Sequence, residues 1–93
     1  MVRRASIRVT GLVQGVYYRY TAKEKADLLG LTGTVRNMPD RSVLIVCEGE
    51  EEDVQSLIEW CRHGPRGARV DKVDVRWEEP GGRFFDFSVT YLQ

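Results

Sequence analysis

The stretch GLVQGVYYR, residues 11–19, lies between a stretch with the alternation of a strand and a stretch with the periodicity of a helix. Residues 5–9 are apolar at every second position, with polar residues between, which predicts a strand with one buried face. Residues 18–29 repeat apolar side chains with a helical period, and Gly30 is a natural helix end. The stretch is therefore expected to connect a first strand to a first helix.

The middle of the chain predicts a hairpin and a second helix. Two short alternating strands over residues 33–47 surround a turn at residues 39–41. Five of the six residues 48–53 are acidic. We expect these carboxylates in the first turn of a helix that runs through Cys61, because they would face the positive end of the helix dipole.

Alternation over residues 73–77 predicts a further strand, and alternating apolar residues over 85–91 predict a short additional one at the C-terminus. The order β-α-β-β-α-β predicts an α+β fold of the ferredoxin-like kind, in which two helices cover one face of an antiparallel sheet. We expect residues 1–93 to form a single domain, because no linker and no internal repeat is visible.

Composition narrows the functional classes. The chain has 93 residues, and its 42% hydrophobic and 30% charged residues are ordinary for a globular protein. Fourteen basic and fourteen acidic residues cancel, so the positive surplus of a typical nucleic-acid binder is missing and no nucleic-acid partner is expected. No apolar run reaches the roughly 20 residues that span a bilayer, and the start lacks a signal-peptide pattern. A cytoplasmic monomer with no membrane contact is expected.

The connecting stretch has the chemistry of an anion site. The first amides of a helix lack intrahelical acceptors, and the helix dipole places partial positive charge there. Gly15 leaves room for a ligand, so the N–H groups from Gly15 to Arg19 are able to converge on a small anion. The guanidinium of Arg19 fits phosphate oxygens. An ordinary strand–helix turn with a solvated arginine is the alternative.

The same stretch, GLVQGVYYR, resembles the signature of the acylphosphatases, which hydrolyse carboxyl–phosphate mixed anhydrides. Residues 33–49 resemble a second stretch of that family, a glycine and an asparagine followed by a turn, a valine and a glycine. Residues 64–70 are similar to a further segment of its bacterial and archaeal members. The resemblance covers nearly the whole chain, and it implies the same βαββαβ fold.

The resemblance also implies roles for individual residues. Arg19 would bind the phosphate and Asn37 would orient the attacking water. The backbone amides lining the loop would be those of Gly15, Val16, Tyr17, Tyr18 and Arg19. The implied substrate is a small-molecule acyl phosphate, with inorganic phosphate or sulfate as an inhibitor. No cofactor and no metal is expected.

Two positions depart from the family pattern. Thr34 stands where an aromatic residue is usual, and we expect it to alter the wall near the acyl end of the substrate. Arg41 stands where the turn usually has glycine, and we expect strain of about 1 kcal/mol if this residue adopts a positive φ. Neither departure falls on Arg19 or Asn37.

Three other functions are compatible with this fold. An RNA-recognition domain would need aromatic residues on its central strands, and residues 42–47 contain none. A ligand-sensing domain usually accompanies a catalytic domain, and the single domain expected over residues 1–93 disfavours this alternative. An inactive relative would bind a phosphate ester without turnover, but the presence of both Arg19 and Asn37 disfavours this alternative.

Several reactive residue types are expected to be structural. His63, the only histidine, sits at the end of the second predicted helix, where a cation suits the dipole. Cys47 and Cys61 fall on predicted core faces, so buried, inert thiols are favoured over a disulfide or a nucleophile. The acidic run 48–53 lacks the spacing of a calcium loop, so a solvated helix start is favoured over a metal site.

Overall fold

The computed structural model describes residues 1–91 and has the predicted order of elements. The elements are β1 (Val2–Leu12), α1 (Tyr18–Leu28), β2 (Thr32–Asn37), β3 (Val43–Glu50), α2 (Glu51–Cys61), β4 (Arg69–Glu78) and β5 (Phe87–Val89). Neither of the two helices in the described chain is long and apolar enough to cross a membrane.

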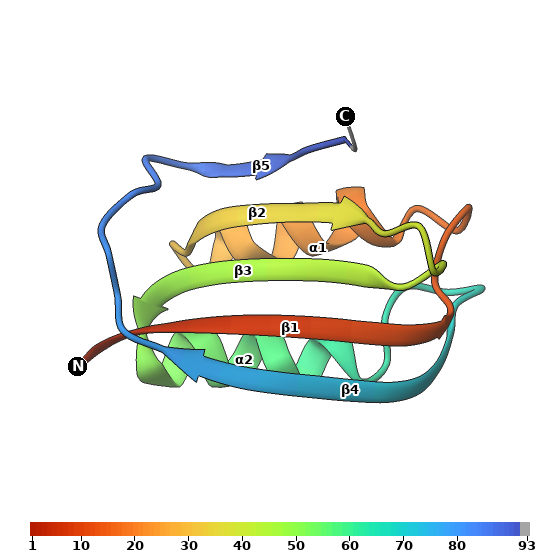
Figure 1. Ribbon diagram of the computed structural model, residues 1–93, viewed down its shortest axis with the longest axis horizontal. Helices are drawn as coiled ribbons and strands as arrows, with labels where there is room; N and C mark the ends of the chain where they lie inside the picture. The colour runs from red at the N-terminus through yellow and green to blue at the C-terminus, as the bar shows by residue number, and fades with distance from the viewer. Residues whose placement is uncertain (92–93) are drawn as a thin grey trace.

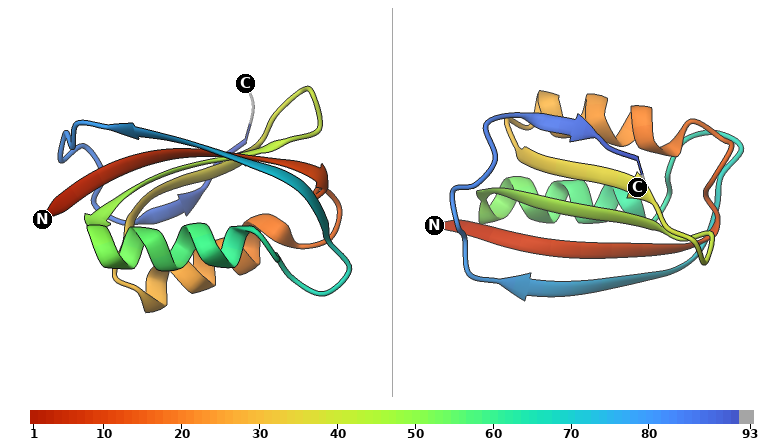
Figure 2. Two further views of the ribbon diagram at one scale, coloured as in Figure 1. Left: turned by 90° about the horizontal axis from the view of Figure 1, so that it is seen from below. Right: turned by 45° about the horizontal axis from the view of Figure 1, so that its top comes forward.

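The strands form one sheet in the order β4-β1-β3-β2-β5, with both helices on the same face (Figures 1 and 2). The four longer strands pair in antiparallel fashion, which confirms the predicted ferredoxin-like α+β fold. The short β5 pairs with β2 in parallel, so the sheet is mixed at this edge. Alternation alone did not specify this direction, because both directions bury every second residue.

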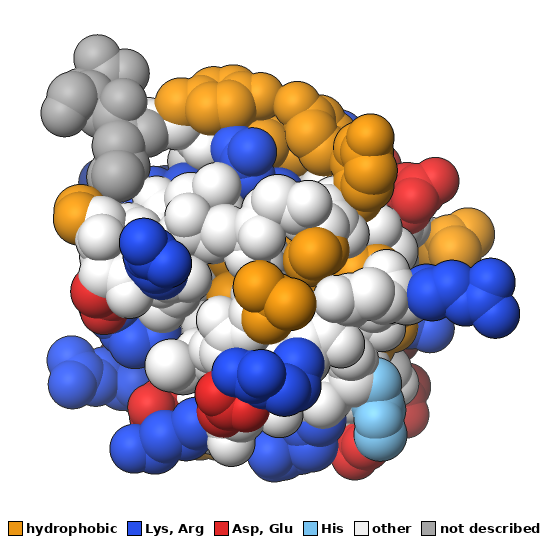
Figure 3. All heavy atoms as spheres, turned by 90° about the vertical axis from the view of Figure 1, so that its right-hand side faces the viewer, with side chains coloured by type: hydrophobic (Ala, Val, Ile, Leu, Met, Phe, Trp, Pro, Cys, Tyr) orange, Lys and Arg blue, Asp and Glu red, His pale blue; other side chains and the backbone are white. Residues whose placement is uncertain are grey.

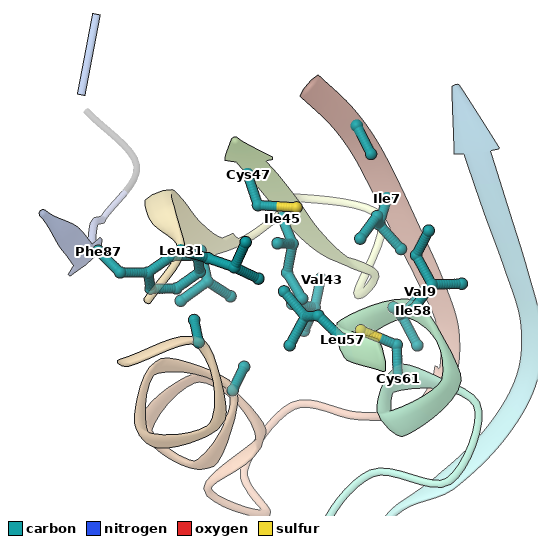
Figure 4. Packing of buried hydrophobic residues seen from close by; sticks show 14 of the residues in the cluster. Ile7, Val9, Leu31, Val43, Ile45, Cys47, Leu57, Ile58, Cys61 and Phe87 are labelled. Carbon is teal, nitrogen blue, oxygen red and sulfur yellow. The ribbon is translucent and has the colours of Figure 1, made fainter. Parts of the chain in front are cut away.

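The core lies between the sheet and the helices (Figure 4). On β1, Ala5, Ile7 and Val9 are fully buried, and they pair across the sheet with three buried residues of β3. The alternation of β1 therefore marks its core face correctly. The helices contribute the buried residues Tyr18, Ala22 and Ala26 from α1 and Val54, Leu57, Ile58 and Cys61 from α2.

The acidic run does not lie wholly in a helix, which corrects the prediction. Residues 51–53 occupy the first turn of α2, as expected, but Glu48 and Glu50 belong to β3. Glu48 is buried on the helix-free face of the sheet. The sequence around Glu48 does not indicate that its side chain is buried, because its hydrogen-bond partners Arg4 and Gly81 lie more than thirty residues away in the chain.

The predicted C-terminal strand is shorter than its apolar alternation. Only residues 87–89 pair with β2, and Phe87 is buried. Phe85 is 98% exposed and Tyr91 lies beyond the strand. The segment before Phe87 crosses from one edge of the sheet to the other along the end where the N-terminus lies (Figure 1), which leaves Phe85 outside the core.

Glu48 holds this crossing segment against the sheet. Its carboxylate forms an ion pair with Arg4, and the Nε of Arg4 donates to it over 2.6 Å. The backbone N–H groups of Gly81 and Gly82 donate to the same carboxylate over 2.9 and 3.1 Å. Burial by itself would raise the pKa of Glu48, but these donors hold that pKa below its usual value.

We predict that Glu48→Gln destabilises the fold by about 3 kcal/mol, because it leaves the guanidinium of Arg4 buried without a counter-charge. Denaturant unfolding measures this change. Glu50→Gln is the matched control, since Glu50 pairs with the N-terminal ammonium in solvent and its loss should cost less than about 0.5 kcal/mol.

The Glu48→Gln effect should also depend on pH. A carboxyl whose folded pKa is lowered contributes stability above its unfolded pKa of about 4.3, and this contribution is lost as the pH falls through the folded value. The difference in the free energy of unfolding between the wild type and Glu48→Gln should therefore be largest at pH 7 and should shrink below about pH 4. A difference that is constant from pH 7 to the acid limit contradicts this assignment.

We predict that both cysteines resist alkylation in the native protein at pH 8. Cys47 and Cys61 are free and fully buried, and burial raises the pKa of each thiol to about 12, so the reactive thiolate is scarce. Mass spectrometry after iodoacetamide treatment should find no adduct on the folded chain and two on the unfolded chain. Rapid labelling of either thiol in the folded protein would contradict this.

Candidate functional site

The backbone between β1 and α1 turns twice through the left-handed region. Gly15 has φ 76° and Tyr17 has φ 62°, with Val16 between them on the negative side. Alternation of handedness between neighbouring residues makes their N–H groups converge into a concave anion-binding nest. Gly15 adopts this conformation at little cost, whereas Tyr17 adopts it with strain. The loop therefore has the predicted nest geometry, and Tyr17 contributes to it in a way that its residue type does not indicate.

The N–H groups of this loop are free to bind a ligand. Within the part of the chain that the structure describes, the amides of residues 15–19 donate to no acceptor, and the first backbone bond of the helix runs from Thr21 to the carbonyl of Tyr17. Tyr17 is the N-cap of α1 and makes no side-chain cap, and the first turn carries no acidic residue. The helix start therefore presents positive charge that no carboxylate of its own turn neutralises.

Tyr18 fixes the base of the loop in the core. Its ring is buried and lies 5.1 Å from the ring of Trp60. Its hydroxyl donates to the carbonyl of Cys61 over 2.7 Å, and burial raises its pKa far above the usual value, so the phenol stays neutral. A Cβ at Gly64 would come within 2.7 Å of this ring, which explains the glycine there.

Gln14 joins the loop to the turn between β2 and β3. Its Nε2 donates to the carbonyls of Met38 and Ser42 over 3.0 and 2.9 Å. Met38 follows Asn37, so this side chain fixes the end of β2 relative to Gly15. Sequence reasoning missed Gln14, because its partners are 24 and 28 residues away. The only local indication of this role is that Gln14 carries a side-chain amide and lies between Gly11 and Gly15.

The same turn is braced from the sheet. The carboxylate of Asp40 accepts from the backbone and the hydroxyl of Ser42, and these bonds hold its pKa below the usual value. Arg8 of β1 donates to Asp40 and to Ser42 over 2.9 and 3.0 Å. Arg41 has φ 75°, as its place in the turn predicted. The turn thus holds Arg41 in a conformation that favours glycine.

Arg19 follows Tyr18 in the first turn of α1, and its side chain is half-buried. Its guanidinium carbon lies 5.1 Å from the centre of the Tyr91 ring and 5.8 Å from that of Tyr20. Among residues 1–91 it has no carboxylate within ion-pair distance. Its charge is therefore available to an anion.

Asn37 ends β2 with its side chain on the helix side of the sheet. Its Oδ1 is buried and has no hydrogen-bond donor among the described residues. A buried acceptor without a partner costs about 1–3 kcal/mol, so such an atom generally serves a water or a ligand. Thr34 lies on the opposite face of β2, beside Val46. Because Thr34 sits an odd number of residues from Asn37, its side chain points away from that of Asn37, and its expected effect on the wall near the acyl end of the substrate stays a prediction.

One pocket of about 290 Å³ brings these groups together at the end of the molecule facing the viewer in Figure 3. Its lining contains Gly15, Tyr17, Tyr18, Arg19 and Asn37, all of which the sequence predicted. Val16 is not in the lining, because its side chain packs against the core. Val13 and Tyr20 also line the pocket, although their residue types and positions in the sequence do not indicate it. Among the described residues that line it, Arg19 is the only charged side chain, so the pocket is suited to an anion.

The other candidate residues lie away from this pocket. His63 is exposed, lies just beyond α2 and faces Glu59 at 3.3 Å. Cys47 and Cys61 are both buried in the core. Within residues 1–91, no group of three His, Cys, Asp or Glu side chains is arranged to hold a metal ion.

Comparisons with known proteins agree on one family. Residues 5–89 match the family model described as Acylphosphatase. An acylphosphatase of Methylococcus capsulatus is 50% identical over 88 residues, which covers 95% of this chain and 96% of the relative. The crystal structure of acylphosphatase from Bacillus subtilis is similar with a TM-score of 0.92 and 34% identity, covering 98% of this chain and all of that one. An acylphosphatase structure from Coxiella burnetii has a TM-score of 0.91, 34% identity and coverage of 96% and 93%.

Proposed function

The chain belongs to the acylphosphatase family of hydrolases, and we propose that it cleaves acyl phosphates by in-line attack of a water that Asn37 orients. In this proposal the amides of residues 15–19 and the guanidinium of Arg19 hold the phosphate. The observation that carries it is the pocket itself, in which loop amides, an arginine and a buried amide oxygen, all without a protein partner among residues 1–91, face one space.

The phosphate oxygens are the first part of the substrate to be recognised. Backbone N–H groups and a planar guanidinium form charge-assisted hydrogen bonds with them. Such donors also stabilise the transition state, in which the equatorial oxygens carry spread negative charge. Because Tyr18 and Gln14 anchor the loop on both sides, the donors are held in place before the substrate arrives.

The water is the second reactant. The Oδ1 of Asn37 accepts a hydrogen bond from it and directs its oxygen toward phosphorus. The new bond forms between the water oxygen and phosphorus while the bond from phosphorus to the acyl oxygen breaks, and the electron pair leaves with the carboxylate. A carboxylate is a good leaving group at neutral pH, so no strong general acid is required.

The proton of the attacking water goes to the phosphate. Asparagine accepts a hydrogen bond but does not remove the proton. The described pocket lining contains no carboxylate and no histidine that could serve as a base near neutral pH. The products are a carboxylate and inorganic phosphate. Phosphate monoesters should be poor substrates, because their alkoxide leaving groups need an acid that this lining lacks.

We predict that the protein releases inorganic phosphate from acetyl phosphate or benzoyl phosphate at the same rate with and without EDTA. Phosphate and sulfate should inhibit competitively, because they occupy the same nest. A loss of turnover in EDTA that an added divalent cation restores would contradict the proposal.

Asn37→Ala should lower kcat about 100-fold or more, because the water loses its orientation, while the inhibition constant of inorganic phosphate changes little. Steady-state kinetics with phosphate as inhibitor separates the two effects. His63→Ala is the control and should keep its turnover, since His63 is exposed beyond α2. Loss of phosphate binding with normal turnover of bound substrate in Asn37→Ala would mean that the roles are misassigned.

Arg19→Lys should lower kcat/KM by about tenfold or more, because an ammonium replaces the planar fork with a point charge. The inhibition constant of inorganic phosphate should rise in the same variant. Unchanged kinetics and unchanged phosphate affinity would remove Arg19 from the proposed mechanism.

A further inference from the structure

The guanidinium of Arg19 lies over two tyrosine rings, one from α1 and one from the segment that follows β5. Its carbon lies 5.1 Å from the ring centre of Tyr91 and 5.8 Å from that of Tyr20. The hydroxyls of the two tyrosines lie 2.8 Å apart and share a hydrogen bond. Figure 3 shows hydrophobic side chains along the rim of this end of the molecule, with basic side chains beside them.

An aromatic support suits an arginine that must bind phosphate. A carboxylate partner would hold the guanidinium, but it would occupy some of its N–H donors and neutralise its charge. The face of a ring attracts the cation and takes none of its in-plane donors. Arg19 has no carboxylate partner in residues 1–91, and within this part of the chain the two tyrosine rings are the aromatic groups that its guanidinium lies over.

Secondary structure places the backbone of both tyrosines. Tyr20 lies in the first turn of α1, one residue after Arg19. Tyr91 follows Thr90, whose backbone N–H donates to the carbonyl of Val35 over 2.9 Å. Val35 lies on β2, the strand that carries Asn37. One strand therefore places Asn37 directly and helps to place Arg19 through the chain that follows β5.

Both tyrosines lie at the surface beside Arg19. Tyr20 is 49% exposed and Tyr91 is 58% exposed, so neither is a core residue. Tyr20 lines the pocket that contains Arg19 and Asn37. The hydrogen bond between the hydroxyls links the two rings, which restricts how either ring turns away from the guanidinium.

We propose that Tyr20 and Tyr91 are positioning residues that hold the Arg19 guanidinium over the phosphate nest, with Tyr91 linking the C-terminal strand to the active site. The proposal rests on the phosphate-binding role proposed for Arg19. The rings restrict the conformations of the Arg19 side chain before the substrate binds, so less side-chain entropy is lost on binding.

Tyr91→Leu removes the ring and should raise the dissociation constant of inorganic phosphate and the KM for acetyl phosphate by about fivefold, with a smaller change in kcat. Tyr91→Phe keeps the ring and should stay within about twofold of the wild type. Phe85→Leu is the matched control, because Phe85 is an exposed aromatic residue of the same C-terminal region and is 98% exposed. It should leave phosphate affinity unchanged.

A double-mutant cycle distinguishes positioning from a general effect on structure. In the Arg19→Ala background, Tyr91→Leu should have no further effect on the dissociation constant of phosphate, measured by calorimetry. An undiminished effect in that background overturns the proposal, as does wild-type phosphate affinity in Tyr91→Leu. If Tyr91→Leu lowers the melting temperature strongly, Tyr20→Leu repeats the cycle from the helix side with the same criteria.

The cycle also separates this proposal from the one on which it rests. Wild-type phosphate affinity in Arg19→Ala alone would contradict the phosphate-binding role of Arg19. Weakened binding in Arg19→Ala together with unchanged binding in Tyr91→Leu would leave that role intact and would overturn only the positioning role of the tyrosines.

Discussion

The site depends on one backbone constraint, the left-handed turns at Gly15 and Tyr17 that leave the first amides of α1 without acceptors. Tyr17, a non-glycine residue with positive φ, adopts this conformation at a cost in free energy. The fold holds this arrangement by anchoring both sides of the loop. Tyr18 is buried against Trp60 and donates to a carbonyl at the end of α2, and Gln14 bonds to the β2–β3 turn. Because the amides are held in place by these contacts, an anion that accepts from them needs no prior rearrangement of the loop.

The core and the candidate site occupy different parts of the molecule. The sheet and both helices bury a continuous core whose residues come from every element except β4, which packs at its border with partly buried side chains (Figure 4). All the chemistry lies at one end, where the β1–α1 loop and the β2–β3 turn meet. At the other end, the Glu48–Arg4 pair fixes the segment that leads to β5 and so to Tyr91. In the proposal made above, the C-terminal part of the chain serves the site through Tyr91 as well as the sheet through β5.

The sequence predicted the features that depend on local periodicity or on a short motif. Alternation marked the core faces of β1 and β3, and the helical period marked Tyr18, Ala22 and Ala26. The motif resemblance placed Arg19 and Asn37 at one pocket. The sequence did not predict the features that depend on contacts between residues far apart in the chain. The burial of Glu48 needs Arg4 and Gly81, the role of Gln14 needs Met38, and the support of Arg19 needs Tyr91. The positive φ of Tyr17 is imposed by the fold against its own preference.

The most direct test of the account is a titration of the amide resonances with inorganic phosphate by NMR. If the loop is an anion nest, the amides of residues 15–19 should shift together and saturably, with one common dissociation constant, while those of β4 stay in place. Shifts that are absent from residues 15–19, or that centre instead on the surface arginines Arg41 and Arg69, would contradict the central claim that the backbone of this loop binds the phosphate.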